Sequence, residues 1–579
     1  MLVDFREEVK ASLDEALVSL GYGGADVGIE TPPEGVDSDL ASTVAFELAD
    51  DDEVDGENPV EFAEEIAREV EIGGYDLVGN VFAEGPYVNF GVSDEYLRRT
   101  LESACDDVVA QLDDRDEKVV LEHTSANPTG PLHVGRARNP IIGDSLARIL
   151  RSAGYDFDVE YYVNDMGRQV ATIAWGLEEF DLEADDDLGE KPDHDVVRYY
   201  RRANEVLEAE DERAEEAERE VEELLQALEQ CDEDALDRVG EAVDTCLEGQ
   251  LESLERLGAE YDSFVRESSF VVDGDVDEVA ESLKDDERCY KEGDAYKLDL
   301  TDFGVDKELV FLRSDGTSLY TTRDIAYHID KFERCDTAVN VLGEDHKLQT
   351  RQLGAALEVL GEERKPENIF YSYVNLPEGK MSTREGNVVN IDDLLDEAVE
   401  RARDEVEKRA EERDRDIENP DEVAENVGIG AVRFDVVARQ PEKPITFRWE
   451  EALDFDGQRA PSIQYVHARA SGILEKARDE GVEASVDVAA LETEEERRLV
   501  RKVGELSRVV DEAADELAPH KVATYSRELA EAFNAFYREC HVLDAEDDVT
   551  RARLGLVLAA RNAIAESLDL VGVETPEAM

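Results

Sequence analysis

The stretch from Lys118 to Val163 constrains the fold more than any other part of the chain. A compact apolar run is followed by a loop rich in proline and glycine, then by a helical pattern and a second apolar run. A strand, a glycine-bearing loop, a helix and another strand are typical of a parallel α/β sheet. We expect the same sheet to continue where short apolar runs recur, at Leu309–Leu312, Ala338–Leu342 and Ile369–Val374.

The 579 residues are enough for two to four domains. Residues 1–112 mix helical periodicity with short β-rich runs, which predicts a small α+β module. Residues 113–405 carry the sheet pattern, and residues 406–579 show the apolar spacing of a helical bundle. We therefore predict a multidomain fold in which an α/β domain lies between an α+β module and an all-α domain.

A highly charged helical segment interrupts the sheet pattern at about residues 178–258. Its acidic and arginine residues are interleaved, as in EDERAEEAEREVEELLQAL. A coiled hairpin inserted into the α/β domain and an arm that grips RNA both fit this pattern. We favour the hairpin, because charge runs on helices are usually solvated faces.

The net charge is extreme: 147 acidic residues against 61 basic ones give −86. Such a surface suits either an acidic interaction protein or a protein of a very salty, halophilic cytoplasm. We favour the second, because at ~1 M salt the screening length is only ~3 Å and the charges mainly hold water and cations. The low count of 16 lysines also fits a salty cytoplasm, because short acidic side chains take the place of long apolar lysine stems on the surface.

No apolar run approaches the ~20 residues of a membrane span, and the first residues do not resemble a secretory signal. The six cysteines are scattered, without the spacing of zinc ligands. They are Cys105, Cys231, Cys246, Cys289, Cys335 and Cys540. We therefore expect a cytoplasmic protein with free thiols, no membrane partner and no structural metal.

The loop TSANPTGPLHVGRARNPIIGD (Thr124–Asp144) leaves a predicted strand and enters a predicted helix. Gly135 would allow a ligand to approach closely, and a helix N-terminus offers free N–H groups to an anion. His133 would then stand where it stabilises charge in a phosphoryl or adenylyl transfer. Taken alone, His133 is also consistent with a histidine that only caps its loop.

A second loop, LPEGKMSTREGNVVN (Leu376–Asn390), lies about 245 residues further on. Such a basic loop closes over a triphosphate, with Lys380 and Arg384 neutralising negative charge. Alone it is also consistent with a solvent-exposed loop. Because both loops flank one α/β domain, we interpret them as two halves of one ATP site.

These loops resemble known signatures. HVGR resembles the HIGH signature of class I aminoacyl-tRNA synthetases, and KMST resembles their KMSK loop. Wider blocks resemble the arginyl-tRNA synthetases, of a halophilic archaeal type. These blocks are EGPYVNF, EHTSANPTGPLHVGRARNPIIGD, YYVNDMGRQV, RSDGTSLYTTRDIAYHIDKF, KMSTREGNVV, QYVHAR and the C-terminal LVGVETPEAM.

The resemblance implies a Rossmann-type class I catalytic domain with a helical insertion, an N-terminal module that contacts the tRNA elbow, and an anticodon-binding bundle. It implies that ATP, with Mg²⁺, activates L-arginine to arginyl-adenylate, and that the arginyl group passes to tRNA(Arg) with release of AMP and pyrophosphate. We expect a monomer.

The resemblance also assigns roles by position. The catalytic residues it implies are His133, Arg136, Lys380 and Arg384. ATP would be bound by His133, Gly135, Arg136, Lys380, Met381 and Ser382.

An arginine pocket needs carboxylates, because a planar guanidinium is read by a bidentate fork. For Asp324 the alternative is a helix N-cap. The residues implied to bind arginine are Glu122, Ser125, Asn127, Tyr320, Asp324 and His346.

Contacts with tRNA are implied in both flanking domains. Tyrosine can stack on an unpaired base, and asparagine can read a base edge. For Tyr465 a core role is an open alternative. The implied residues are Tyr87, Asn89, Tyr465, His467, Arg469 and Met579.

Two positions depart from the family pattern. Arg136 stands at the second histidine of HIGH, and Thr383 stands at the second lysine of KMSK. Some members carry a compensating lysine at the position of Gly130, and here Arg384 is the nearest substitute. The alternative is a tRNA-binding protein of the same fold that has lost activation. A cysteine-specific relative and a small-molecule nucleotidyltransferase fit less well, because no cysteine lies near the motifs and two RNA-facing domains would be unexplained.

Overall fold

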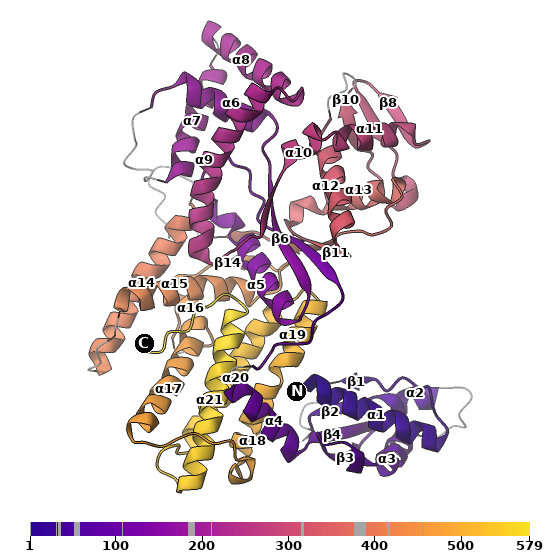
Figure 1. Cartoon of the computed structure of the whole chain (residues 1–579), viewed down its shortest axis with the longest axis vertical. Helices are drawn as coiled ribbons and strands as arrows, with labels where there is room; N and C mark the ends of the chain where they lie inside the picture. Colours follow the sequence, from indigo (N-terminus) through magenta and orange to yellow (C-terminus); the bar gives the residue numbers. More distant parts are fainter. Residues whose placement is uncertain are drawn as a thin grey trace.

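The computed structural model describes residues 2–30, 32, 36, 38–50, 58–106, 108–182, 191–209, 211–313, 318–375, 389–413, 417, 419–455 and 457–579. A parallel sheet crosses the middle of the molecule, with a helical bundle below it and two inserted bodies above it (Figure 1). The N-terminal module lies beside the bundle.

The N-terminal module is a four-stranded antiparallel sheet covered by helices, which confirms the predicted α+β class. The strands run in the order β1-β2-β4-β3. On α1, Phe5, Val9 and Leu13 recur every four residues and are fully buried. The elements are α1 (Leu2–Leu20), β1 (Ile29–Glu30), β2 (Leu40–Ser42), α2 (Val44–Asp50), α3 (Pro59–Glu69), β3 (Val78–Glu84), β4 (Tyr87–Val92) and α4 (Asp94–Cys105).

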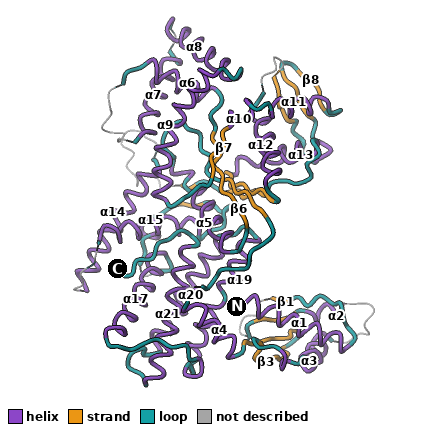
Figure 2. The backbone as a smooth tube through the Cα atoms, viewed as in Figure 1, coloured by secondary structure: helices purple, strands orange, loops and turns teal. Residues whose placement is uncertain are grey.

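The central sheet has five strands, all parallel, in the order β12-β11-β5-β6-β7. It runs through the centre of the chain trace (Figure 2). The strand–loop–helix–strand unit predicted from Lys118 onward is confirmed as β5, α5 and β6. The elements are β5 (Lys118–Glu122), α5 (Arg138–Ser152), β6 (Asp156–Val163), β7 (Ser263–Arg266), β11 (Thr337–Gly343), α13 (Lys347–Val359) and β12 (Glu367–Tyr371).

The charged segment between β6 and β7 is helical, as predicted, but it is larger than a hairpin. Four helices pack together there, and they form the upper left body in Figure 1. On α8 the buried residues Ala214, Ala217, Val221, Leu224 and Leu228 are three or four apart, so the charges occupy the remaining faces. The helices are α6 (Arg168–Glu179), α7 (Pro192–Leu207), α8 (Glu212–Glu229) and α9 (Glu233–Leu257).

The prediction that Leu309–Leu312 belongs to the parallel sheet is wrong. These residues lie in β10, which pairs antiparallel with β9 in a separate sheet of order β10-β9-β8. A short apolar run shows that a strand is buried, but it does not show which sheet the strand joins. This second inserted body contains α10 (Glu267–Val272), α11 (Asp275–Asp285), β8 (Cys289–Glu292), β9 (Ala295–Leu298), β10 (Leu309–Arg313) and α12 (Tyr320–Arg334).

The C-terminal part is a helical bundle, as predicted, apart from a two-residue strand pairing of β13 with β14. None of the described helices combines the length and the apolar character of a bilayer span. The elements are β13 (Val374–Asn375), α14 (Ile391–Arg413), α15 (Pro420–Val437), β14 (Ile445–Thr446), α16 (Trp449–Ala452), α17 (Ala460–Asp479), α18 (Glu494–Gly504), α19 (Leu506–Asp515), α20 (His520–Glu539) and α21 (Asp547–Asp569).

Arg433 of α15 joins three parts of the molecule. Its side chain is fully buried. It donates to the Asp144 carboxylate of α5, to the Leu257 carbonyl at the end of α9 (2.5 Å) and to the Val571 carbonyl after α21 (3.1 Å). A Cβ atom at Gly572 would lie 1.9 Å from its Nη2.

Candidate active site

The site lies at the carboxyl edge of the parallel sheet, where the strand order reverses. From β5 the chain passes to β6 and β7 on one side, and later reaches β11 and β12 on the other. Open α/β sheets bind ligands in the crevice outside such a reversal. Glu122 ends β5 and Gly343 ends β11, so the residues that follow them surround this crevice.

The turn after β5 has an unusual backbone. Thr124 (φ 68°) and Ser125 (φ 41°) both lie in the left-handed region, which costs a non-glycine residue about 1 kcal/mol or more. Asn139 Oδ1 accepts the Thr124 N–H (2.6 Å) and holds the turn. Ser125 Oγ donates to Glu122 Oε1 (2.9 Å) and accepts the Tyr162 N–H (3.1 Å). The strained turn therefore fixes Ser125 between β5 and β6.

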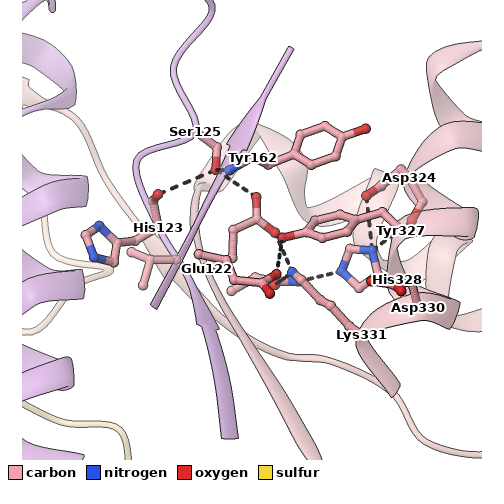
Figure 3. A network of polar contacts seen from close by, with 12 residues as sticks. Glu122, His123, Ser125, Tyr162, Asp324, Tyr327, His328, Asp330 and Lys331 are labelled. Carbon is pink, nitrogen blue, oxygen red and sulfur yellow. Dashed lines mark hydrogen bonds and ion pairs between the residues drawn. The ribbon is translucent and has the colours of Figure 1, made fainter. Parts of the chain in front are cut away.

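Glu122 has a cation partner inside the protein. Its Oε2 accepts a hydrogen bond from Nζ of Lys331, which is fully buried, at 2.5 Å (Figure 3). The Lys331 ammonium lies 4.1 Å from the ring centre of Tyr327, on which Tyr162 stacks at 4.5 Å. The buried Lys331 ammonium therefore balances the charge of the Glu122 carboxylate.

A cavity of about 230 Å³ lies next to these groups. Five of the six residues predicted to bind arginine line it, although they come from three separate segments of the chain. These five are Glu122, Ser125, Tyr320, Asp324 and His346. The cavity walls also include Tyr162, Asn164, Glu267 and Gln349, none of which was predicted to bind arginine.

Asp324 lies in the second turn of α12, which begins at Tyr320 with Leu319 as its N-cap. The N-cap alternative for Asp324 is therefore wrong. Burial raises its pKa, but His328, Lys331 and His346 more than offset burial and leave the pKa below its ordinary value. Asp324 is thus ionised near neutral pH and is 45% exposed toward the cavity.

Glu267 is a further carboxylate of the cavity. Burial raises its pKa to about 7, although Arg323 opposes this shift with Nη1 3.4 Å from Oε1. Glu267 follows directly after β7, at the carboxyl edge of the sheet. The run SFVR is only four residues long, and no strand was predicted there from the sequence. Recognising it would have placed Glu267 at the site.

Asn127, the sixth predicted arginine ligand, lines a neighbouring groove of about 1120 Å³ between α6, α8 and α12. Its Nδ2 donates to Gln169 Oε1 at 3.4 Å. The groove shares Asn164, Glu267 and Tyr320 with the cavity, so the two adjoin.

His133 precedes a single 3-10 turn, η2 (Val134–Arg136), which leads into α5. Its Nδ1 accepts the Gly135 N–H at 3.0 Å, so the histidine caps this turn, as the simpler interpretation predicted. Burial and the charge of Arg136 lower the pKa of His133, which keeps the imidazole neutral at neutral pH. Both side chains are nevertheless exposed.

The segment containing His133 pairs with the end of the second predicted loop. Val134 N donates to Val389 O (3.0 Å), and Ile391 N donates to Leu132 O (2.8 Å). The structure therefore brings these two distant segments together. The predicted loop residues Lys380, Met381, Ser382, Thr383 and Arg384 lie outside the described residues.

The residues predicted to contact tRNA differ in accessibility. Tyr87, Tyr465 and Arg469 are half-buried, and the last two line a cavity of about 280 Å³ with Arg409 and Arg527. The other three are buried. They are Asn89, which accepts from Ser38 Oγ (3.1 Å), His467, which contacts the Pro576 carbonyl (3.2 Å), and Met579, which packs near Phe455. The structure gives these three packing roles, and their contact with tRNA stays a prediction.

Comparisons with known proteins agree across the whole chain. Residues 4–92 match the arginyl tRNA synthetase N terminal domain, residues 103–449 match the catalytic domain of class I (R) tRNA synthetases, and residues 463–579 match the DALR anticodon binding domain.

Similar proteins include two curated arginine–tRNA ligases that match from end to end. The one from Halorubrum lacusprofundi is 51% identical, and the one from Haloarcula marismortui is 53% identical, with 100% of each chain covered. The solved structure of Thermus thermophilus arginyl-tRNA synthetase is 30% identical, with a TM-score of 0.83 over 99% of this chain and 100% of that one. The chain belongs to the class I arginyl-tRNA synthetases.

Proposed function

We propose that this chain activates L-arginine with ATP at the carboxyl edge of the β5–β11 sheet and transfers the arginyl group to tRNA(Arg). As a member of its family the chain is an arginine–tRNA ligase. The observation that carries the residue assignment is the cavity where Glu122, Glu267 and Asp324 converge. The pairing of segments 132–134 and 389–391 supports the assignment of the two ATP-binding loops to one site.

In the first step an oxygen of the arginine carboxylate attacks the α-phosphorus of ATP. The bond from that phosphorus to the bridging oxygen breaks, and pyrophosphate leaves. In the second step a terminal ribose hydroxyl of tRNA attacks the activated carbonyl, and AMP leaves. Mg²⁺ is expected to enter with the nucleotide as part of the substrate.

The arginine side chain would enter the 230 Å³ cavity. Asp324 is ionised and can take a guanidinium bidentately. Glu122 is held by Lys331 and Ser125, yet a carboxylate has about four lone-pair sites and can accept further hydrogen bonds. Tyr320 and His346 would close the cavity, and Asn127 would face the substrate from the groove.

His133, Gly135 and Arg136 would bind the ATP phosphates together with Lys380, Met381, Ser382 and Arg384. The neutral imidazole of His133 can donate without adding charge, and Arg136 supplies a fixed cation beside it. We infer that Arg136 and Arg384 replace the histidine and the lysine that the family signature has at positions 136 and 383.

The flanking domains would bind tRNA, with Tyr87 and Asn89 at the elbow and Tyr465, His467, Arg469 and Met579 at the anticodon side. The cavity lined by Arg409, Arg469 and Arg527 supports an RNA contact, because it gathers cations on an otherwise acidic protein. The boundaries at residues 112 and 405 stay predictions. The six unpaired cysteines support a reducing, cytoplasmic setting, and we expect a monomer there.

Arginine-dependent ATP–pyrophosphate exchange, measured in multimolar KCl with and without tRNA, tests the proposal. We expect exchange that requires both arginine and tRNA. Absence of exchange and of aminoacylation under all these conditions would overturn it in favour of the non-catalytic alternative. That alternative gains no support from the relatives, which are named arginine–tRNA ligases and match over their full length.

A further inference from the structure

Two carboxylates of the proposed arginine pocket are joined through the protein interior. Lys331 Nζ donates to Glu122 Oε2 (2.5 Å) and to Asn340 Oδ1 (3.0 Å). Asn340 Nδ2 lies 3.0 Å from His328 Nε2, and His328 Nδ1 lies 3.2 Å from Asp324 Oδ1. Figure 3 labels Glu122, Lys331, His328 and Asp324 of this network.

Only one arrangement of protons satisfies the hydrogen bonds among Lys331, Asn340 and His328. An ammonium only donates, so the group of Asn340 that faces Lys331 must be its oxygen. The Asn340 nitrogen therefore faces His328, and it also lies 3.4 Å from the acceptor Oδ1 of Asn368. Because Nδ2 can only donate, His328 Nε2 must accept, and the imidazole proton is left on Nδ1.

That proton faces Asp324. His328 Nδ1 is 2.8 Å from the Asp324 carbonyl oxygen and 3.2 Å from Oδ1. A proton on His328 Nε2 would meet the Asn340 amide hydrogens, so the geometry favours the proton on Nδ1. Lys331, Asn340 and His328 are each at most 2% exposed, so water does not compete for these hydrogen bonds.

The charged and titratable groups around His328 come from several elements. Asp324 and Lys331 share its helix, Glu122 faces Lys331 from β5, and His346 lies in the wall of the same cavity. Further out, the Tyr327 hydroxyl donates to Glu160 of β6 at 2.9 Å. The Lys331 ammonium therefore sets the direction of the hydrogen bonds from Lys331 through Asn340 to His328.

We propose that Lys331, Asn340 and His328 are positioning residues of the arginine pocket. Together they hold His328 in the tautomer that donates to Asp324, and so they keep the Asp324 carboxylate oriented for the guanidinium. This inference rests on the proposed function, because it takes Asp324 as an arginine ligand.

A matched pair of substitutions at His328 tests this role. His328→Asn places an amide nitrogen near the position of Nδ1 and keeps a donor for Asp324. His328→Gln places its amide near the position of Nε2 and loses that donor. We expect KM for arginine to rise roughly 10- to 100-fold in His328→Gln, the loss expected for a hydrogen bond to a charged group.

The rise should be much smaller in His328→Asn, and KM for ATP should change in neither variant. A role in filling space alone predicts the opposite order, since glutamine is closer to histidine in size. Equal KM values for arginine, or a larger rise in His328→Asn, would overturn the positioning role. Thermal melting of both variants checks that they fold.

Asp324→Asn separates this inference from the function on which it rests. If it leaves KM for arginine unchanged, the pocket assignment fails. If it raises KM while the two His328 variants behave alike, only the positioning role fails.

A spectroscopic measurement reports on the tautomer directly. ¹⁵N spectra of labelled histidine should show the His328 proton on Nδ1, with His328→Asn identifying the signal. Asn340→Asp presents an acceptor to His328 in place of a donor, so it should bring a proton to Nε2. A native protein with the proton on Nε2 would contradict the proposal.

Discussion

At the scale of single residues, the site contains groups held in energetically unfavourable states. Thr124 and Ser125 have left-handed backbones, Lys331 is a fully buried cation, and burial raises the pKa of Glu267 to about 7. Such states persist only where surrounding contacts enforce them, and they cluster at functional sites.

The buried pair of Lys331 and Glu122 should be costly to break and cheap to replace. Lys331→Met leaves Glu122 buried without its cation, and we expect a loss of roughly 3–5 kcal/mol in the free energy of unfolding. Adding Glu122→Gln to Lys331→Met should recover much of this loss. Urea unfolding in high KCl measures both variants. A double variant no more stable than Lys331→Met would show that the pair itself is not responsible.

Glu267 should make stability depend on pH. Its pKa is raised from 4.5 to about 7, so the folded state holds the proton more tightly than the unfolded state does. The contribution is therefore fully present below pH 4.5 and is lost as the pH rises towards 7. Glutamine does not ionise, so Glu267→Gln should escape this loss and gain stability relative to the wild type between pH 5 and 8. Parallel pH profiles for the two proteins would contradict the shifted pKa.

The resemblance predicted part of the site. Glu122, Ser125, Tyr320 and Asp324 stand in sequence blocks that resemble the family, His346 was predicted by position, and all five line one cavity. Glu267 was not expected, because its importance depends on the position of a four-residue strand. Lys331 could not be foreseen either, since its partner Glu122 is 209 residues away and only the folded chain brings them together.

At the scale of elements, the sequence predicted what is local and failed where pairing is long-range. β5, α5 and β6 were readable because each is a long apolar or periodic run. β10 was placed in the wrong sheet, since its partner β9 lies in a hairpin with weak β character. The insertion was recognised as helical from its charge and spacing, yet its number of helices depends on packing against α6.

The close packing of α5 on β5 should make one glycine irreplaceable. A Cβ atom at Gly143 would lie 2.1 Å from Cγ of the buried His123. Gly143→Ala should therefore destabilise the protein by about 1–3 kcal/mol. Gly240 on α9 is the matched control, because a Cβ there meets nothing within 4 Å. Gly240→Ala should stabilise by about 0.5–1 kcal/mol. Equal melting temperatures for the two variants would show that α5 has room to move.

At the scale of the whole molecule, the charge of −86 dominates behaviour in solution. Many described ion pairs are exposed surface contacts such as Arg68–Glu64, which individually stabilise little. The acidic excess is therefore unbalanced by pairing, and screening by salt must limit the repulsion. The halobacterial relatives Halorubrum and Haloarcula are consistent with this reading.

Lowering KCl from about 3 M to about 0.1 M lengthens the screening distance to ~10 Å and should lower the melting temperature strongly. Circular dichroism during heating measures this change. A neutral osmolyte at low salt is the control, since it favours compact states without screening charge. A melting temperature independent of KCl would show that the acidic surface does not govern stability.

The contacts of Arg433 limit which segments can be exchanged between this protein and its relatives. Its guanidinium contacts α5, α9 and the tail after α21, and it fills the space that a side chain at residue 572 would need. Arg433 and Gly572 are therefore sterically coupled, although they lie far apart in the sequence. A chimaera that takes its last hundred residues from a relative with any side chain at position 572 should fail to assemble until position 433 is exchanged as well.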